Sequence, residues 1–236
     1  ADLMRESAAL ARRHGLRLHT HLAETVEENA YCTDNFGARP LDLMEDLGWL
    51  ADDVWFAHGV HFDDAEVRRL GAAATGVAHC PSSNARLAAG TAPVTELVTA
   101  GAPVGLGVDG VASNEVGRLF PELRQSLYAA RLRAGRADAL MPSDALRLAT
   151  YGGARCLGRD DIGVLEPGRR ADIAVWPADD LGDVADPVSA LVLGPDRLVR
   201  HLLVGGRAVV EDGRLLGADL PAARRELARR AARLWS

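Results

Sequence analysis

Short apolar runs alternate with longer amphipathic segments over the first 160 residues of the chain. Four of these runs are typical of buried strands, at residues 15–21, 54–58, 76–79 and 104–108. The segments around them carry apolar residues at helical spacing, at 1–14, 63–73, 92–100, 116–134 and 142–156. Two further helical pieces before residue 50 are separated at Gly37 and Pro40. This alternation predicts an α/β fold in which helices cover a parallel sheet.

The pattern changes after about residue 160, where short β-rich runs are interrupted by glycine and proline. These runs lie at 163–177 and 190–216, and Gly205-Gly206 is a hairpin signal between two of them. An arginine-rich helix is predicted over 219–235, with a solvated arginine face preferred to a polyanion site. We therefore predict three parts, at 1–160, 161–218 and 219–236.

Histidine and acidic residues stand at or just after the ends of the four apolar runs. Because the carboxyl ends of parallel strands lie at one end of a sheet or barrel, these side chains are expected to meet there. Such a cluster is typical of metal-assisted chemistry. Its members are His21, Glu24, His58, His79 and Asp109.

Two of these residues are the best candidates for metal ligands. His21 can bind Zn²⁺ through a ring nitrogen, and Asp109 ends an apolar run where a buried carboxylate needs a partner or a metal. Glu24, three residues after His21, is placed to transfer protons. A structural histidine near a capping glutamate, or a turn aspartate, remains the alternative. Together the residues indicate a metal-hydroxide hydrolase, because zinc lowers the pKa of water from about 16 towards 7.

Other polar residues near the strand ends are candidates for the site, for substrate contact or for the core. His58 is placed in the site because of its register with His21 and Asp109. His61 fits either substrate contact or surface exposure, and His19 is expected to be a buried core residue. We predict substrate contacts for His61, His79, Asn84 and Asn114.

The residues that follow His79 are expected to form a turn over 80–84, because Pro81 fixes φ and Asn84 can bond its own backbone. Within this turn, Cys80 is expected to be a buried small residue rather than a nucleophile, since no base stands beside it in the sequence.

Composition excludes several other classes of function. The net charge of −6 argues against a nucleic-acid partner, and no apolar run is long enough to span a bilayer. All 27 basic residues are arginine, so no lysine is available for a Schiff base or a carbamylated metal bridge. Three scattered cysteines and a charged opening segment predict a cytoplasmic protein without disulfides or a signal peptide.

Four motifs in this order resemble the amidohydrolase superfamily, in its single-metal deaminase branch. They are THLAET (20–25), AHGVHF (57–62), HCPSSN (79–84) and GVDGVASN (107–114). The segment from residue 163 onward is similar to the closing strands of that family's small β-sandwich. Within the branch, residues 28–49, 58–66 and 111–132 most resemble 8-oxoguanine deaminases.

This resemblance implies a (β/α)₈ barrel of which only strands five to eight are present, with part of the β-sandwich. It implies that His21 and Asp109 bind one divalent metal, Zn²⁺ or alternatively Fe²⁺. His58 would orient the metal-bound hydroxide, Glu24 would protonate a ring nitrogen, and Asp109 would pass a proton to the leaving amine. The reaction would be hydrolysis of a C–N bond in a cyclic amidine, converting 8-oxoguanine to urate and ammonia.

Other functions fit the same motifs. An s-triazine hydrolase or a guanine, cytosine or S-adenosylhomocysteine deaminase would share the metal-hydroxide step, and a non-catalytic assembly module is a further alternative. The family's HxH motif on strand one is not found, and two protein ligands are too few for a typical zinc site. We therefore expect this polypeptide alone to bind zinc weakly and to be inactive. Open strand edges predict self-association, or pairing with the N-terminal half of the barrel.

Overall fold

The computed structural model describes residues 1–178 and 185–235, which belong to two compact units. The first unit comprises Ala1–Arg169 and Leu181–Asp196, and the second comprises Arg170–Asp180 and Arg197–Ser236. The predicted boundaries at residues 160 and 218 stay a prediction. In the described part of the chain, no helix has both the length and the apolar character needed to cross a membrane.

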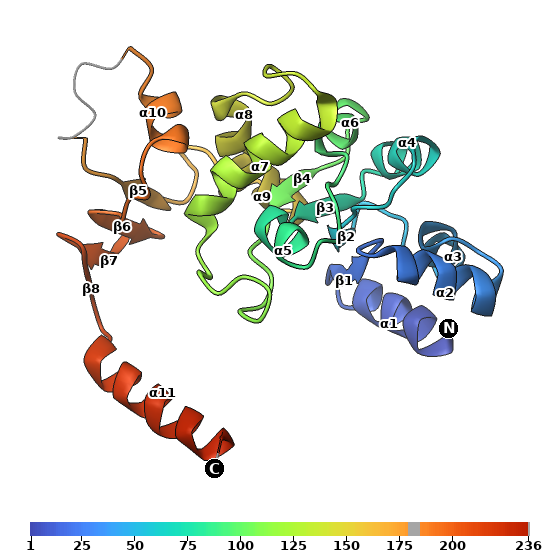
Figure 1. Ribbon diagram of the computed structural model, residues 1–236, viewed down its shortest axis with the longest axis horizontal. Coiled ribbons are helices and arrows are strands. Elements are labelled where there is room, and N and C mark those ends of the chain that lie inside the picture. Colours follow the sequence, from blue (N-terminus) through green and yellow to red (C-terminus); the bar gives the residue numbers. More distant parts are fainter. Residues whose placement is uncertain (179–184, 236) are drawn as a thin grey trace. The chain divides into compact units, whose positions relative to one another are not determined.

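The first unit is built on a four-stranded parallel sheet with the order β1-β2-β3-β4 (Figure 1). In register, His21 pairs with Ala57, Ala57 with Ala78, and Ala78 with Gly105. The carboxyl ends of the strands therefore lie together, which confirms the predicted parallel α/β arrangement. The strands are β1 (Leu18–Leu22), β2 (Val54–His58), β3 (Gly76–His79) and β4 (Val104–Leu106).

Helices connect and cover these strands (Figure 1). Alternate strand residues such as Leu22, Phe56 and Val77 are buried in the core that the helices close. Over the first half of the unit the helices are α1 (Asp2–Arg13), α2 (Val26–Phe36), α3 (Pro40–Asp46), α4 (Asp64–Ala72), α5 (Pro81–Arg86) and α6 (Val94–Thr99). They continue with α7 (Leu119–Ala134), α8 (Pro142–Arg147), the π-helix η1 (Leu148–Gly152), α9 (Gly153–Cys156) and α10 (Pro187–Leu193).

Local sequence signals fix where several helices begin and end. Asp63 and Glu66 form a reciprocal capping box at the start of α4. Thr25 caps α2, which ends at Gly37 in the left-handed conformation with a φ of 67°. The predicted break between the two helical pieces before residue 50 is confirmed.

Two predicted segments differ from the structure. Residues 80–84 were expected to form a turn, but Pro81 begins the short helix α5, in which the Asn84 N–H donates to the Cys80 carbonyl. Residues 190–193 were expected to be β-rich, but they belong to α10, which Asp186 caps. Both helices have a proline at the first helical position, Pro81 and Pro187, which favours a helical first turn, and α10 is also capped by the Asp186 side chain.

The second unit holds a four-stranded antiparallel sheet with the order β5-β6-β7-β8. Gly205 and Gly206 have φ values of 56° and 80° and connect β6 to β7, so the predicted hairpin is confirmed. A single helix, α11 (Leu220–Leu234), follows the sheet and buries none of its residues. The strands are β5 (Ile173–Val175), β6 (His201–Val204), β7 (Arg207–Glu211) and β8 (Arg214–Leu215).

Candidate metal centre

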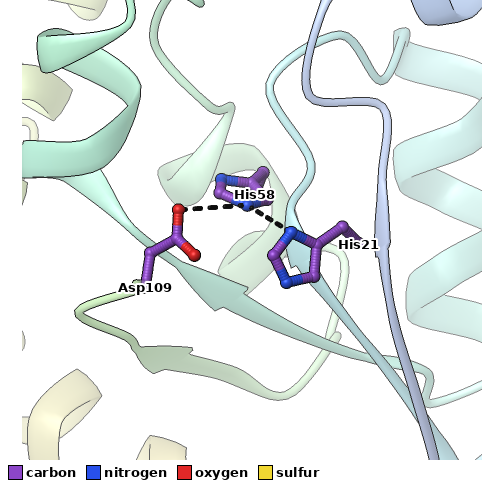
Figure 2. A group of neighbouring side chains, drawn as sticks. All are labelled: His21, His58 and Asp109. Atoms are coloured by element: carbon purple, nitrogen blue, oxygen red, sulfur yellow. Dashed lines mark hydrogen bonds and ion pairs between the residues drawn. The ribbon is translucent and has the colours of Figure 1, made fainter. Parts of the chain in front are cut away.

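Three side chains converge at the carboxyl ends of the parallel strands. One ligand atom from each of His21, His58 and Asp109 lies within 4.8 Å of the other two. Figure 2 shows His58 between the other two residues, with its Nε2 atom 3.0 Å from Nδ1 of His21 and 3.8 Å from Oδ2 of Asp109. The sequence motifs that contain these residues are therefore brought to one place.

Left-handed backbone conformations occur at residues of the site and help to orient their side chains. Six non-glycine residues of the described chain have positive φ, and three of them are Ala23 (53°), His58 (72°) and Asp109 (61°). Regular alternation would put His58 on the same side of β2 as the core residue Phe56. The positive φ breaks this alternation, and the imidazole instead lies against His21 (Figure 2). Such strained residues concentrate at functional sites.

Asp109 is held by hydrogen bonds to both carboxylate oxygens. Oδ2 accepts from the Ser83 hydroxyl at 2.6 Å and from the Ser113 hydroxyl at 3.0 Å, and Oδ1 accepts from the Gly110 N–H at 2.7 Å. Burial would raise the pKa of Asp109, but these hydrogen bonds outweigh it and hold the pKa below its ordinary value of 3.8. The group is therefore a carboxylate at neutral pH.

The other two members of the cluster have supports of their own. The buried His58 ring places Nδ1 2.8 Å from Oδ1 of Asn84. Oε2 of Glu24 lies 3.7 Å from Nε2 of His58. The Glu24 backbone is fixed because the Glu28 carboxylate accepts from the N–H groups of Ala23 and Glu24, at 2.9 and 2.8 Å.

The donor set fits a divalent metal. Two imidazole nitrogens and one carboxylate oxygen are ligands that zinc prefers, and iron(II) accepts the same set. Ligand atoms around a tetrahedral zinc lie roughly 3.3 Å apart; here the partner atoms lie 3.0 and 3.8 Å from His58 Nε2, and one ligand atom from each of the three residues lies within 4.8 Å of the others. His58 is thus a third candidate donor beside the predicted ligands His21 and Asp109.

The predicted substrate-contact residues have other surroundings in this structure. Asn84 contacts His58, and Asn114 donates to Glu122 at 2.9 Å. His79 is fully buried, and neither ring nitrogen has a hydrogen-bond partner among the described residues. Burial lowers the pKa of His79 to about 3, so the ring is neutral. Nε2 of His61 is also buried without a described partner, and its contact with substrate stays a prediction.

Two further expectations concern residues beside the cluster. His19 was expected in the core but is exposed, stacked on Trp55 with the ring centroids 3.4 Å apart. The face of β1 that carries His19 is therefore exposed in the described part of the chain. Cys80 was expected to be a buried small residue rather than a nucleophile, and burial raises its pKa to about 12.

The supporting residues were missed in the sequence, although some left a signal. Thr25-x-x-Glu28 is a capping-box pattern, but Glu28 turns to the backbone of residues 23 and 24. Ser83 lies inside the HCPSSN motif, and Glu122 lies on the buried face of α7. No local pattern indicates which of these groups reach the site, because their partners are distant in the chain.

Similarity to known proteins shows which family the chain belongs to. A profile described as "Amidohydrolase family" matches residues 1–209. The chain belongs to the amidohydrolase family. An 8-oxoguanine deaminase from Pseudomonas aeruginosa is 51% identical over 94% of this chain and 49% of its own length.

Two zinc-containing crystal structures are also similar to this amidohydrolase chain. An adenosine deaminase from Xanthomonas campestris superposes with a TM-score of 0.95 at 30% identity, over 98% of this chain and 53% of the deaminase. An atrazine chlorohydrolase from Arthrobacter aurescens gives a TM-score of 0.91 at 35% identity, over 97% and 51%. The chain thus spans about half the length of the relatives it matches.

Proposed function

We propose that this amidohydrolase chain supplies half of the active site of a metal-dependent deaminase that acts on a purine-type base. The observation that carries the proposal is the convergence of His21, His58 and Asp109, with Glu24 beside them. The 51% identity to an 8-oxoguanine deaminase supports 8-oxoguanine as the substrate. The products would be urate and ammonia.

His21, His58 and Asp109 would hold the metal, which we propose to be zinc. A bound zinc ion lowers the pKa of a water molecule and so provides a nucleophile at neutral pH. Zinc is favoured over iron(II) by the two zinc-containing relatives.

Residues of this chain would then transfer the protons that the reaction requires. Glu24 would protonate the ring nitrogen next to the amine-bearing carbon, while the Asp109 carboxylate would orient the attacking water. Asp109, an ionised carboxylate, accepts a proton from the water and delivers it to the departing amine. The C–O bond would form first, with water supplying the oxygen, and the C–N bond would then break as ammonia leaves. The second proton of the water would return to Glu24, which restores the acid.

The substrate is identified by comparing kcat/KM for several candidate heterocycles. The two structural relatives are named for adenosine and for atrazine, whose common feature is an electron-poor nitrogen heterocycle with a leaving group on a ring carbon. A panel of 8-oxoguanine, guanine, cytosine, adenosine and an s-triazine should give the highest kcat/KM with 8-oxoguanine. A higher value for any of the others would reassign the substrate.

We further propose that β1–β4 are strands five to eight of a (β/α)₈ barrel and that β5–β8 are part of its β-sandwich. The proposed parts are residues 1–160 for the half barrel, 161–218 for the sandwich strands and 219–236 for the terminal helix. β1 and β4 stand at the two edges of their sheet, where further strands would add. Three donors leave room for ligands from the other half of the barrel.

The 236-residue chain by itself should therefore bind zinc weakly, release no ammonia from 8-oxoguanine and self-associate. Steady-state ammonia release by the purified chain would contradict the half-site proposal. A monomer in light scattering would contradict the self-association.

The proton-transfer role is tested by Glu24→Gln in the complete enzyme that contains this chain. Because the amide cannot donate the required proton, kcat should fall by roughly 10²–10⁴-fold, while zinc content stays unchanged. Glu27→Gln is the matched control, since Glu27 is exposed in the first turn of α2 and should leave kcat unaltered. Normal turnover in Glu24→Gln would refute the assignment.

A further inference from the structure

We propose that Asn84 is a positioning residue that fixes the tautomer of His58 and so presents the Nε2 lone pair to the reaction site. This inference rests on the proposed function, because it assigns a purpose to the orientation of His58. Asn84 would act through His58, in place of the direct substrate contact predicted from the sequence.

The two ring nitrogens of His58 face different environments. Nδ1 lies 2.8 Å from Oδ1 of Asn84, whereas Nε2 faces His21 at 3.0 Å, Glu24 at 3.7 Å and Asp109 at 3.8 Å. An amide oxygen can only accept a hydrogen bond, so Nδ1 carries the proton. In a neutral imidazole Nε2 is then unprotonated, and its lone pair points at the cluster.

The opposite tautomer would disable this arrangement. With the proton on Nε2, His58 could neither bind a metal nor accept a hydrogen bond from water at that atom. Nδ1 would then need a donor, which only a reversed Asn84 amide could supply at 2.8 Å. The geometry of a single amide therefore decides which atom the ring presents to the site.

Burial makes the Asn84–His58 contact hard to replace. Both side chains are at most 1% exposed, so bulk water does not reach them. Loss of one partner from a buried hydrogen bond leaves the other unsatisfied at a cost of about 1–3 kcal/mol. The Asn84 Nδ2 group has no hydrogen-bond partner among the described residues, so the contact to His58 is the one that orients this amide.

The backbone of α5 holds Asn84 in place. Its N–H donates to the Cys80 carbonyl at 3.0 Å, and its own carbonyl accepts from the Ala89 N–H at 2.9 Å. The preceding residue, Ser83, holds Asp109 from the same helix. The short helix α5 thus supports two separate members of the cluster through adjacent residues.

The tautomer can be measured without metal or substrate. Two-bond ¹H–¹⁵N spectra of the ¹⁵N-histidine-labelled, metal-free chain distinguish protonated from unprotonated ring nitrogens, and His58→Gln assigns the His58 signals. The wild type and Asn84→Asp should both show the Nδ1–H form, because a carboxylate also only accepts. Asn84→Ala should show a mixture of the two tautomers. An Nε2–H ring in the wild type or in Asn84→Asp would overturn the proposal.

A second measurement addresses the consequence for metal binding. In the complete enzyme, Asn84→Ala should weaken zinc affinity by roughly 10–100-fold, the usual effect of removing a group that orients a ligand, and Asn84→Asp should restore most of it. Ser126→Ala is the control, because Ser126 is equally buried and its hydroxyl donates to the Leu123 carbonyl within α7, away from His58. Unchanged tautomer and affinity in Asn84→Ala would also overturn the proposal.

These outcomes are separable from the proposed activity. If Asn84→Ala does not fold, the wild-type and Asn84→Asp spectra still decide the tautomer. If Glu24→Gln retains turnover while the spectra show Nδ1–H, the proposed reaction fails but the positioning role of Asn84 stands.

Discussion

Two arginines link α3 to α4, and they should differ sharply in their contribution to stability. Arg39 binds the Glu66 carboxylate with two N–H groups, Nε at 2.9 Å and Nη2 at 2.7 Å, and Nη2 also donates to the His61 carbonyl at 2.9 Å. Arg69 binds Asp42 and Glu45 across the same two helices. The pKa of each arginine is raised, chiefly by these hydrogen bonds, so burial must decide which pair matters more.

The acidic partners differ in burial. Glu66 is 3% exposed, whereas the side chains of Asp42 and Glu45 are 45% and 54% exposed. Removal of one partner from a buried ion pair costs about 3–5 kcal/mol. Because Arg39 itself is 37% exposed and water can partly replace it, we expect Arg39→Ala to lower the free energy of unfolding by about 2–3 kcal/mol. Arg69→Ala should cost less than about 1 kcal/mol.

Urea unfolding followed by circular dichroism measures both values under the same conditions. For a unit of this size, Arg39→Ala should lower Tm by roughly 5–10 °C. Adding Glu66→Gln to Arg39→Ala should recover about 1 kcal/mol, because it removes the stranded charge. The reasoning is refuted if Arg39→Ala costs no more than Arg69→Ala, or if the double variant is the less stable one.

Two other predictions concern stability. Asp63→Ala removes the cap of α4 and should cost about 1 kcal/mol at neutral pH. Because a backbone N–H of α4 holds the pKa of Asp63 below its ordinary 3.8, this contribution is complete above that pH and fades below it; a pH-independent difference in urea melts would contradict this. Gly152→Ala would place a Cβ 2.0 Å from the Val104 carbonyl oxygen and should cost about 1–3 kcal/mol. Gly153→Ala has nothing nearer than 4.0 Å and should be neutral or stabilising, so equal thermal melts of the two variants would count against the packing argument.

The regular elements of the first unit were largely predictable from the sequence. Continuous apolar runs marked β2, β3 and β4, which are largely buried, because both faces of a covered parallel sheet exclude water. The ends were less accurate where glycine intervened. The run at 15–21 becomes a strand only at Leu18, since Gly15 has a φ of 62° and ends the connection from α1. The run at 104–108 stops at Leu106, before the backbone turns at Asp109.

The convergence of His21, His58 and Asp109 was also predictable, because it follows from topology. Their orientation was not. The positive φ at His58 is energetically costly, and no local pattern in the sequence predicts it. It persists because the surrounding structure holds it, and Asn84, which contacts the ring from α5, is distant in the sequence.

The difference between a turn and a helix at residues 80–86 bears directly on the site. Successive residues of a helix point about 100° apart, so Ser83 and Asn84 can face Asp109 and His58 at the same time. In a turn without a helical hydrogen bond, each side chain could move independently of the other. The helical bond from the Asn84 N–H to the Cys80 carbonyl couples them instead. A change that loosens α5 should therefore disturb His58 and Asp109 together, whereas loss of either contact alone should disturb one residue.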